Sequence, residues 1–438
     1  MRERGIDVLV IDHHESEKVS EDAIIINNQL CDYPNKTLSG AGVVYKFCQS
    51  IDRLLGRRYS ELFLDLAALG MVADVMDLRE FETRYLVSKG FKNVRNPLFV
   101  ALSERNSYSM NDTINPMTVA FYIAPYINAI CRSGTIEEKT CVFESMLEFK
   151  ANEKVPSTKR GEAGRTELRV LQAVRYMTNV KSRQKKMRDA GYEAIESLIE
   201  ENNLLDNKIL VACLPKDVKV ESTLRGLIAN QLMSKYQRPV LVLSEMKDSW
   251  EGSGRNYDKM ATFTEFKDFV AKCPGVMYAE GHQGAFGCGI TKKDYNDFID
   301  YSNAALKDID FSPCYGVDFI FQGNNVSKYD ILEIGNLADL WGKGLDEPYV
   351  ALENVPFIKD DIQLLSPDRR PTLKLTHPNG IEFVKFGIDP AVYEELKKHS
   401  RISMNIVGRC SVNMFGGAAT GQILIEDYEV IQAVDYDF

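Results

Sequence analysis

The segment GIDVLVID at residues 5–12 restricts the fold of this chain more than any other feature. It is an apolar, β-branched run that ends at an acidic residue. Such a run is typical of a buried parallel strand that delivers a polar side chain at its C-terminal end. Residues 40–55 and 60–72 follow, with apolar residues at helical spacing. This alternation predicts an α/β domain that extends to about residue 145.

A second α/β pattern follows a polar stretch. Residues 151–164 contain proline and glycine and predict a linker, and residues 165–203 predict one long helix. After the helix, the pattern predicts a strand, a helix and a strand at residues 208–215, 222–236 and 238–245.

The last part of the chain has a different pattern. Residues 373–387 predict a strand, a Pro-Asn-Gly turn and a strand, and residues 401–431 predict two longer strands around a Gly-Gly turn. We therefore expect an antiparallel all-β end domain that forms a small barrel.

Composition excludes several classes of protein. The 438 residues are 45% hydrophobic and 26% charged, which is ordinary for a globular protein and unlike a disordered or collagen-like chain. No apolar run reaches the roughly 18–20 residues of a membrane helix. No small-residue cleavage site follows the first apolar run, so we expect neither a membrane span nor a signal peptide. The nine cysteines are scattered without a CxxC pair, which favours reduced thiols in the cytoplasm over a zinc ribbon.

The charge of the chain is unevenly distributed. The net charge is −10, yet residues 150–190 contain twelve Lys and Arg against four Asp and Glu, a local excess of +8. Such a segment can attract a nucleic-acid backbone. The alternative is a solvated helix face.

The triplet Asp12-His13-His14 is the sharpest local motif. It stands where the first strand is expected to end, which is the usual place for a ligand site on an open α/β sheet. Imidazoles and carboxylates together suit Mn²⁺ or Zn²⁺. Adjacent side chains of an extended chain point in opposite directions, so one histidine would hold a metal and the other would face a phosphate. The alternative is a chance pair of surface histidines.

Asp74 is a second candidate for a metal ligand. It follows a predicted apolar helix, within the segment GMVADVM. A carboxylate buried in such surroundings is costly unless it is paired or binds a metal. The alternative is a helix-terminal or N-cap aspartate.

Three further segments can donate hydrogen bonds to phosphate groups. The segment from Gly281 to Gly287 combines glycines with His282, and the segment GSGR combines Ser253 with Arg255 in a flexible loop. Asn128 and Arg132 form another donor pair near a turn. The alternative for the glycine-rich segments is an ordinary turn.

Taken in order, these motifs resemble the RecJ family of single-stranded-DNA-specific 5′→3′ exonucleases, within the DHH/DHHA1 phosphoesterase superfamily. The resemblance rests on the DHH triplet, the ADVM segment, an IxPxxNAxxR segment, the GSGR and GHxxAxG segments and the final β segment. It implies an α/β fold with four parts. They are a DHH domain with a parallel sheet (1–150), a linker and connecting helix (151–206), a DHHA1 α/β domain (207–320) and an OB-like β-barrel (321–438).

The resemblance also implies the roles of the candidate residues. His13, Asp74 and Asp12 would hold Mn²⁺ or Mg²⁺, with two ions in the complete protein, and His14 and Asp12 would act at the scissile phosphate. The residues implied to bind the phosphates of the strand are Asn128, Arg132, Ser253, Arg255, Gly281 and His282. The implied partners are single-stranded DNA, during repair and recombination, and a helicase or single-strand-binding protein.

The chain departs from the family pattern near its start. The family's Asp-x-Asp cluster and a further aspartate precede the DHH triplet, which here stands at residue 12, and the late pair Asp435 and Asp437 lies at the extreme C-terminus. We therefore expect a fragment, a start codon placed late, or half of a split protein whose partner chain supplies the upstream motifs. Glu280 and Cys131 each replace a glycine of the family pattern.

Three functions are therefore compatible with the sequence. The first is a metal-dependent exonuclease whose activity needs the upstream residues. The second is a DHH phosphodiesterase that acts on small substrates, which the extra β-domain disfavours. The third is a strand-binding scaffold that has lost its metal site, which the missing aspartates favour.

Overall fold

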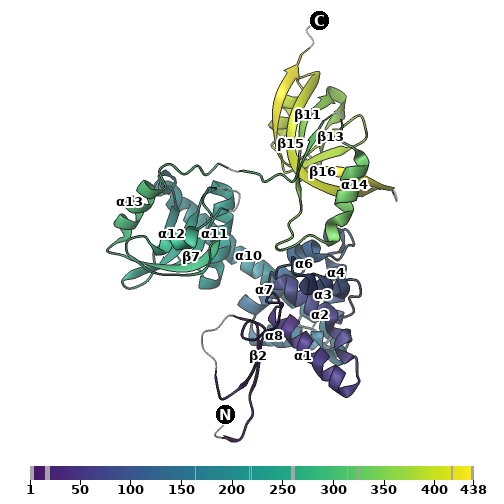
Figure 1. Cartoon of the computed structure of the whole chain (residues 1–438), viewed down its shortest axis with the longest axis vertical. Coiled ribbons are helices and arrows are strands. Elements are labelled where there is room, and N and C mark those ends of the chain that lie inside the picture. Colours follow the sequence, from purple (N-terminus) through teal and green to yellow (C-terminus); the bar gives the residue numbers. More distant parts are fainter. Residues whose placement is uncertain are drawn as a thin grey trace. The chain divides into compact units, whose positions relative to one another are not determined.

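In the computed structural model, the chain begins with two short strands, β1 (Leu9–Asp12) and β2 (Ile24–Asn27), which pair in parallel (Figure 1). The structure describes residues 4–14, 20–162, 164–216, 218, 220–257, 262–312, 314–323, 325–415 and 418–435. The predicted parallel strand is thus confirmed, but the prediction that it is buried is wrong. Leu9, Val10 and Ile24 are 46%, 38% and 65% exposed, because β1 and β2 form a sheet of only two strands.

Helices make up the rest of the N-terminal part. The two predicted helices are present as α1 (Gly40–Leu55) and α2 (Leu64–Ala73). The Ser39 hydroxyl accepts a hydrogen bond from the Gly42 N–H at the start of α1, and Gly56 ends the helix with a left-handed φ of 62°. The other elements are η2 (Tyr59–Phe63), α3 (Phe81–Phe91), α4 (Pro97–Arg105), α5 (Ser107–Met110), α6 (Pro116–Tyr122), α7 (Ala124–Ser133), α8 (Ile136–Met146) and α9 (Glu148–Ala151).

A buried carboxylate fixes the position of α2. Asp65, which is 2% exposed, accepts hydrogen bonds from the backbone N–H groups of Arg95 at 2.9 Å and Asn96 at 2.7 Å. The Asn96 side chain in turn caps α4. The start of α2 is therefore tied to the start of α4, and the other end of α2 leads directly to Asp74.

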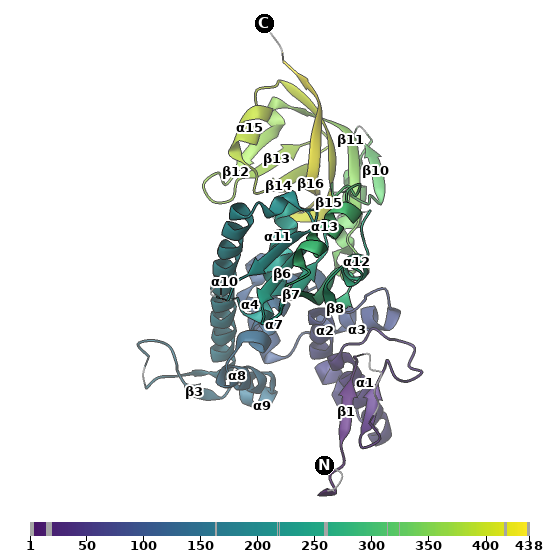
Figure 2. The same ribbon diagram turned by 90° about the vertical axis from the view of Figure 1, so that its left-hand side faces the viewer.

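The predicted long helix is present but begins at Arg169, because residues 166–168 form a strand that pairs with a strand of the predicted linker. Strands β3 (Lys154–Pro156) and β4 (Thr166–Leu168) pair in antiparallel, and α10 (Arg169–Glu201) follows, seen along its length in Figure 2. Arg169 contacts Glu144 and Glu153, and Arg175 contacts Glu167. Part of the local positive charge is thus neutralised by acidic neighbours.

The chain divides into two compact units, Met1–Met177 with Gly316–Phe438, and Thr178–Tyr315. The second unit contains the predicted second α/β pattern. Its sheet has the order β5-β6-β7-β9-β8, in which β5 and β6 are parallel and the other pairs are antiparallel. Its elements are η3 (Leu204–Asp206), β5 (Leu210–Leu214), α11 (Ser222–Tyr236), β6 (Val240–Glu245), β7 (Ser249–Arg255), α12 (Phe266–Ala271), β8 (Val276–His282), β9 (Ala285–Thr291) and α13 (Tyr295–Ala305).

The C-terminal part is a seven-stranded sheet with the order β10-β11-β15-β16-β14-β13-β12. The expectation of a purely antiparallel domain is wrong, because β10 pairs with β11, and β14 with β16, in parallel. The predicted hairpin and the two long strands are present, and Gly416 and Gly417 lie outside the described residues. The elements are β10 (Phe319–Gln322), α14 (Lys328–Gly335), η4 (Asn336–Asp339), β11 (Tyr349–Ile358), η5 (Lys359–Asp361), β12 (Ile362–Leu365), β13 (Thr372–Thr376), β14 (Glu382–Phe386), α15 (Pro390–Leu396), β15 (Arg401–Phe415) and β16 (Ala418–Val434).

Two apolar cores hold these sheets. Buried residues of β5, β6 and β9 pack with α11 and α12 in the second unit. In the C-terminal sheet, Phe357 and Phe383 meet edge to face within a separate buried cluster. No helix in the described part of the chain is long and apolar enough to cross a membrane.

We expect Asp65→Ala to destabilise the N-terminal part by about 2–4 kcal/mol, because the buried Asn96 N–H and the partly buried Arg95 N–H lose their acceptor. Thermal unfolding measured by circular dichroism checks this value. The control is Asp300→Asn, which changes an exposed side chain and should leave the melting temperature unchanged. An unchanged melting temperature for Asp65→Ala would contradict the role given to this carboxylate.

Candidate metal centre and phosphate-binding site

The predicted metal and catalytic residues of the N-terminal part lie together at the C-terminal end of β1. Asp12 is the last residue of β1, and its Oδ1 lies 2.8 Å from His14 Nδ1. His13 Nε2 lies 2.8 Å from Asp74 Oδ2. Ligand atoms of Asp12, His13 and His14 lie within 4.8 Å of one another. A cluster of carboxylates and imidazoles at this spacing suits a divalent metal such as Mn²⁺.

The two histidines lie side by side. Their ring centroids are 4.3 Å apart and the ring planes are inclined at 45°. The prediction that they point in opposite directions is wrong, because β1 ends at Asp12 and the strand alternation does not continue through the histidines. The His13 side chain is 16% exposed, whereas that of His14 is 75% exposed. His13 is therefore the inner member of the pair and His14 the outer one.

Neighbouring groups hold this turn of the chain. Hydrogen bonds from the His14 ring and from the His13 backbone N–H keep the pKa of Asp12 below its usual value. Asn27, which lies opposite Asp12 in the parallel pair, donates to the His14 carbonyl oxygen at 2.9 Å. The sequence analysis missed Asn27. The signal that could have found it is a polar residue at the C-terminal end of the second parallel strand.

Asp74 occupies the C-terminal cap position of α2, and its N–H donates to the Gly70 carbonyl oxygen. The premise that its carboxylate is buried is wrong, since the side chain is 49% exposed. The N-cap alternative is also wrong, whereas a helix-terminal position is confirmed. Because α2 ends beside the histidines, a helix terminus and a strand terminus together supply the cluster.

Asn128 and Arg132 both lie within α7, with Arg132 in the last turn of the helix, next to the short connection to α8. Four residues apart, they share one face of the helix. Arg132 is exposed and Asn128 is partly buried. Helix α7 packs against α2, the helix that leads to Asp74.

The GSGR segment belongs to a strand, so the prediction of a flexible loop there is wrong. The Gly281–Gly287 segment contains the end of one strand, the start of the next and a turn at Gln283 and Gly284, so the alternative of an ordinary turn is confirmed for these two residues. Ser253 and Arg255 belong to β7, and Gly281 and His282 end β8. Glycine suits these strands because the neighbouring groups leave no room for a side chain. A Cβ at Gly254 would overlap the ring of Phe286. Gly281 has a φ of 129°, a conformation that other residues rarely adopt.

The strand register brings the predicted phosphate donors of the second unit onto one face of the sheet. Arg255 on β7 and His282 on β8 both lie opposite Ala285 on β9. Ser253 lies opposite Gly287 in the next row on that face. A cation, a hydroxyl and an imidazole are thus separated by residues with little or no side chain. This arrangement can bind an anion.

Helix α11 determines the position of the Arg255 side chain. A Cβ at Gly226 in α11 would overlap the Arg255 guanidinium, and Arg255 Nη1 donates to the Gly254 carbonyl oxygen at 2.6 Å. The sequence analysis missed Gly226. A glycine in the interior of a predicted helix was the available signal, because glycine destabilises a helix unless close packing requires it.

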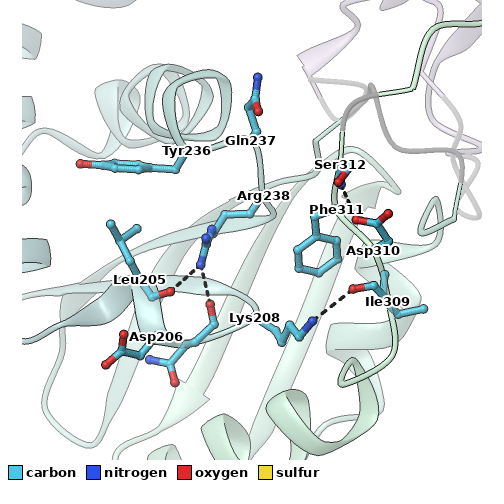
Figure 3. Close-up of a pocket in the computed structure, with 11 residues that line it drawn as sticks. Leu205, Asp206, Lys208, Tyr236, Gln237, Arg238, Ile309, Asp310, Phe311 and Ser312 are labelled. Carbon is cyan, nitrogen blue, oxygen red and sulfur yellow. Dashed lines mark hydrogen bonds between the residues drawn. The ribbon is translucent and has the colours of Figure 1, made fainter.

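The same unit also contains a cavity of about 500 Å³, which is lined by residues other than these phosphate donors (Figure 3). Arg238 Nη1 donates to the carbonyl oxygens of Leu205 and Asn207, and Lys208 Nζ donates to that of Ile309. Burial lowers the pKa of Arg238. These cations bridge chain segments, and none of the predicted site residues lines this cavity.

Comparison with known proteins defines the class to which this fold and site belong. Residues 1–71 match the DHH family, N-terminal domain. The matched segment contains β1, the DHH triplet and most of α2.

The whole chain is also similar to longer proteins. It is 35% identical over 441 residues to YorK, a prophage-derived single-strand DNA-specific exonuclease of Bacillus subtilis, covering 99% of this chain and 75% of YorK. It is 28% identical to the single-stranded-DNA-specific exonuclease RecJ of Bacillus subtilis, covering 98% of this chain and 52% of that protein. The chain belongs to the RecJ family of DHH proteins.

The fold agrees with this assignment. The crystal structure of Thermus thermophilus RecJ in complex with Mn²⁺ superposes with a TM-score of 0.69 at 20% identity. The match covers 99% of this chain and 59% of that structure, so the chain spans little more than half of the solved relative. The α/β fold predicted from the sequence is thereby confirmed.

We expect His13→Ala to weaken Mn²⁺ binding at least about tenfold, because the inner imidazole of the cluster is lost. Isothermal titration calorimetry with Mn²⁺ measures this directly. The control is His399→Ala, which removes a histidine of the C-terminal sheet that contacts Asp435. Equal Mn²⁺ affinity of the two variants would show that the cluster does not bind the metal.

We expect Gly226→Ala to weaken phosphate binding about three- to tenfold, because the new Cβ displaces the Arg255 guanidinium from its position beside the sheet. Gly284→Ala is the matched control, since its Cβ would enter open space. Both variants are titrated with inorganic phosphate. If Gly226→Ala binds phosphate as the control does, Arg255 is not a phosphate donor.

Proposed function

We propose that this chain is part of a metal-dependent 5′→3′ exonuclease that hydrolyses phosphodiester bonds of single-stranded DNA. The observation that carries the proposal is the cluster of Asp12, His13, His14 and Asp74 at the end of a parallel strand, in a chain of the RecJ family. The similar proteins carry that activity in their names, which supports the same substrate here.

In this proposal Asp12, His13 and Asp74 hold Mn²⁺ or Mg²⁺. The Asp12 carboxylate lies 3.6 Å from His13 Nδ1 and the Asp74 carboxylate 2.8 Å from His13 Nε2. Two carboxylates and an imidazole are ligand types that suit such an ion. The bound ion would lower the pKa of a water molecule and stabilise charge on phosphate oxygens. Asp12 accepts from the Nδ1 of His14, so the Nε2 of this exposed ring remains available to a phosphate oxygen.

The phosphate donors have the complementary role. Arg132 and Arg255 would form charge-assisted hydrogen bonds to phosphate oxygens of the strand, because a guanidinium group matches them in charge, and His282 would donate a further hydrogen bond. Ser253, Asn128 and the backbone of Gly281 would add neutral hydrogen bonds. The exposed cations of α10, including Lys185 and Lys186, would attract the strand and make its binding sensitive to salt.

The exposed two-stranded sheet supports a further part of the proposal. Parallel sheets are normally covered on both faces and contain more than two strands. A further parallel strand beside β1 would cover this edge and deliver its own C-terminal residues beside Asp12. We propose that such strands, supplied by a longer polypeptide or by a partner chain, add the remaining metal ligands.

The test is the degradation of 5′-labelled single-stranded DNA in Mn²⁺. This chain is compared with a version extended upstream by a segment that carries the Asp-x-Asp cluster of the family, with and without His13→Ala. We expect cleavage by the extended protein and a loss of at least about a hundredfold in His13→Ala, because a metal ligand is removed. His399→Ala should retain the activity of the extended protein.

Three outcomes would contradict parts of this proposal. Cleavage by the unextended chain at the same rate would show that no further strand is needed. If every version binds the strand but none cleaves it, the chain is a strand-binding scaffold and not part of a nuclease. Cleavage of dinucleotides alone would identify a small-substrate phosphodiesterase.

A further inference from the structure

We infer that Glu280 and Tyr278 form a base-recognition subsite beside the proposed phosphate donors, and that it prefers a nucleobase carrying an amino group. The inference rests on the proposed phosphate-binding role of Arg255 and His282 and adds a determinant of specificity to it.

The subsite lies on a strip of β9 whose residues have little or no side chain. On the face that carries Arg255 and His282, the β9 residues are Ala285, Gly287 and Gly289. A Cβ at Gly287 would have no neighbour closer than 3.7 Å, so no other group covers the surface of the sheet at this residue. Polar side chains of β7 and β8 stand on both sides of this strip.

A β-bulge in β8 closes one end of the strip. The register of β8 shifts between Val276 and Tyr278, and the side chains of both Met277 and Tyr278 lie over Gly289. The Tyr278 hydroxyl donates to Glu251 at 3.4 Å, which fixes the ring. An aromatic ring and a thioether thus form a wall that suits stacking with a base.

Charge is ordered along the strip. Arg255 and His282 mark one end, whereas Glu280 lies opposite Gly287 and Glu251 lies opposite Gly289. A phosphate is therefore drawn to the first end and repelled from the second. Successive rows on one face are about 6.7 Å apart, so a phosphate held at Ala285 places its base over Gly287.

The carboxylate of Glu280 determines which base fits. It is exposed, projects beside the strip, and only accepts hydrogen bonds when ionised. The amino group of cytosine or adenine donates to such an acceptor, whereas the carbonyl oxygen at the same position of uracil or thymine is repelled. Glu280 is therefore the specificity-determining residue, and Tyr278 is the stacking surface.

The experiment compares the binding of 5′-dCMP and 5′-dUMP to the full chain by calorimetry, because these nucleotides differ at the position that pairs with Glu280. We expect the wild type to bind dCMP about three- to tenfold more tightly. Glu280→Gly and Glu280→Gln should bring the ratio to about one. The glutamine variant keeps the shape of the side chain and offers both a donor and an acceptor.

Two controls separate this subsite from the phosphate site. Tyr278→Ala should weaken both nucleotides about three- to tenfold and leave inorganic phosphate unaffected, whereas Tyr278→Phe keeps the stacking ring and should weaken them less than Tyr278→Ala does. Arg255→Ala should weaken both nucleotides and phosphate, with the dCMP preference retained. A wild-type ratio near one, or a ratio unchanged by both Glu280 variants, overturns the inference. Failure to bind phosphate or either nucleotide overturns it together with the phosphate site. If the protein binds phosphate and both nucleotides but does not cleave DNA, the result contradicts only the proposed metal centre.

Discussion

The contact between His13 Nε2 and Asp74 Oδ2 is the interaction on which the N-terminal site depends. It joins the end of a strand to the end of a helix, two segments that the sequence separates widely. Each of these ends is fixed from elsewhere, β1 by its pairing with β2, and α2 by the buried Asp65 carboxylate. The geometry of the cluster is therefore a consequence of backbone hydrogen bonds that lie away from the side chains of the cluster.

Local patterns predicted most elements of the fold. The helix at Ser222–Tyr236 and the helix at Gly40–Leu55 have the predicted bounds, because apolar spacing and a nearby cap or turn agree at both ends. Burial of β1 could not be predicted in the same way. An apolar sequence shows that a strand can pack against other apolar elements, but it does not show whether such elements are present. The parallel pairs β10–β11 and β14–β16 were also missed, because strand partners depend on contacts between distant segments.

The sequence predicted which residues belong to the candidate site, but it did not predict how their side chains are arranged. The DHH triplet and Asp74 do come together, as expected, but the orientation of the two rings depends on where β1 ends, which a single sequence does not specify to one residue. The glycines around Ser253 and His282 were taken as signs of loops. Their position in strands reflects close contacts from the next strand and from Phe286, and such contacts leave no local signal other than glycine itself.

The packing of the Arg255 guanidinium against Gly226 has a thermodynamic consequence. A long cationic side chain ordinarily loses rotamer freedom when it captures an anion, and this loss weakens binding. Here α11 and the Gly254 carbonyl oxygen already restrict the guanidinium, so most of that entropy is lost when the protein folds. In the proposed site, an anion at this position would therefore meet a preorganised arginine, and its affinity would reflect electrostatic attraction with little penalty for ordering the side chain.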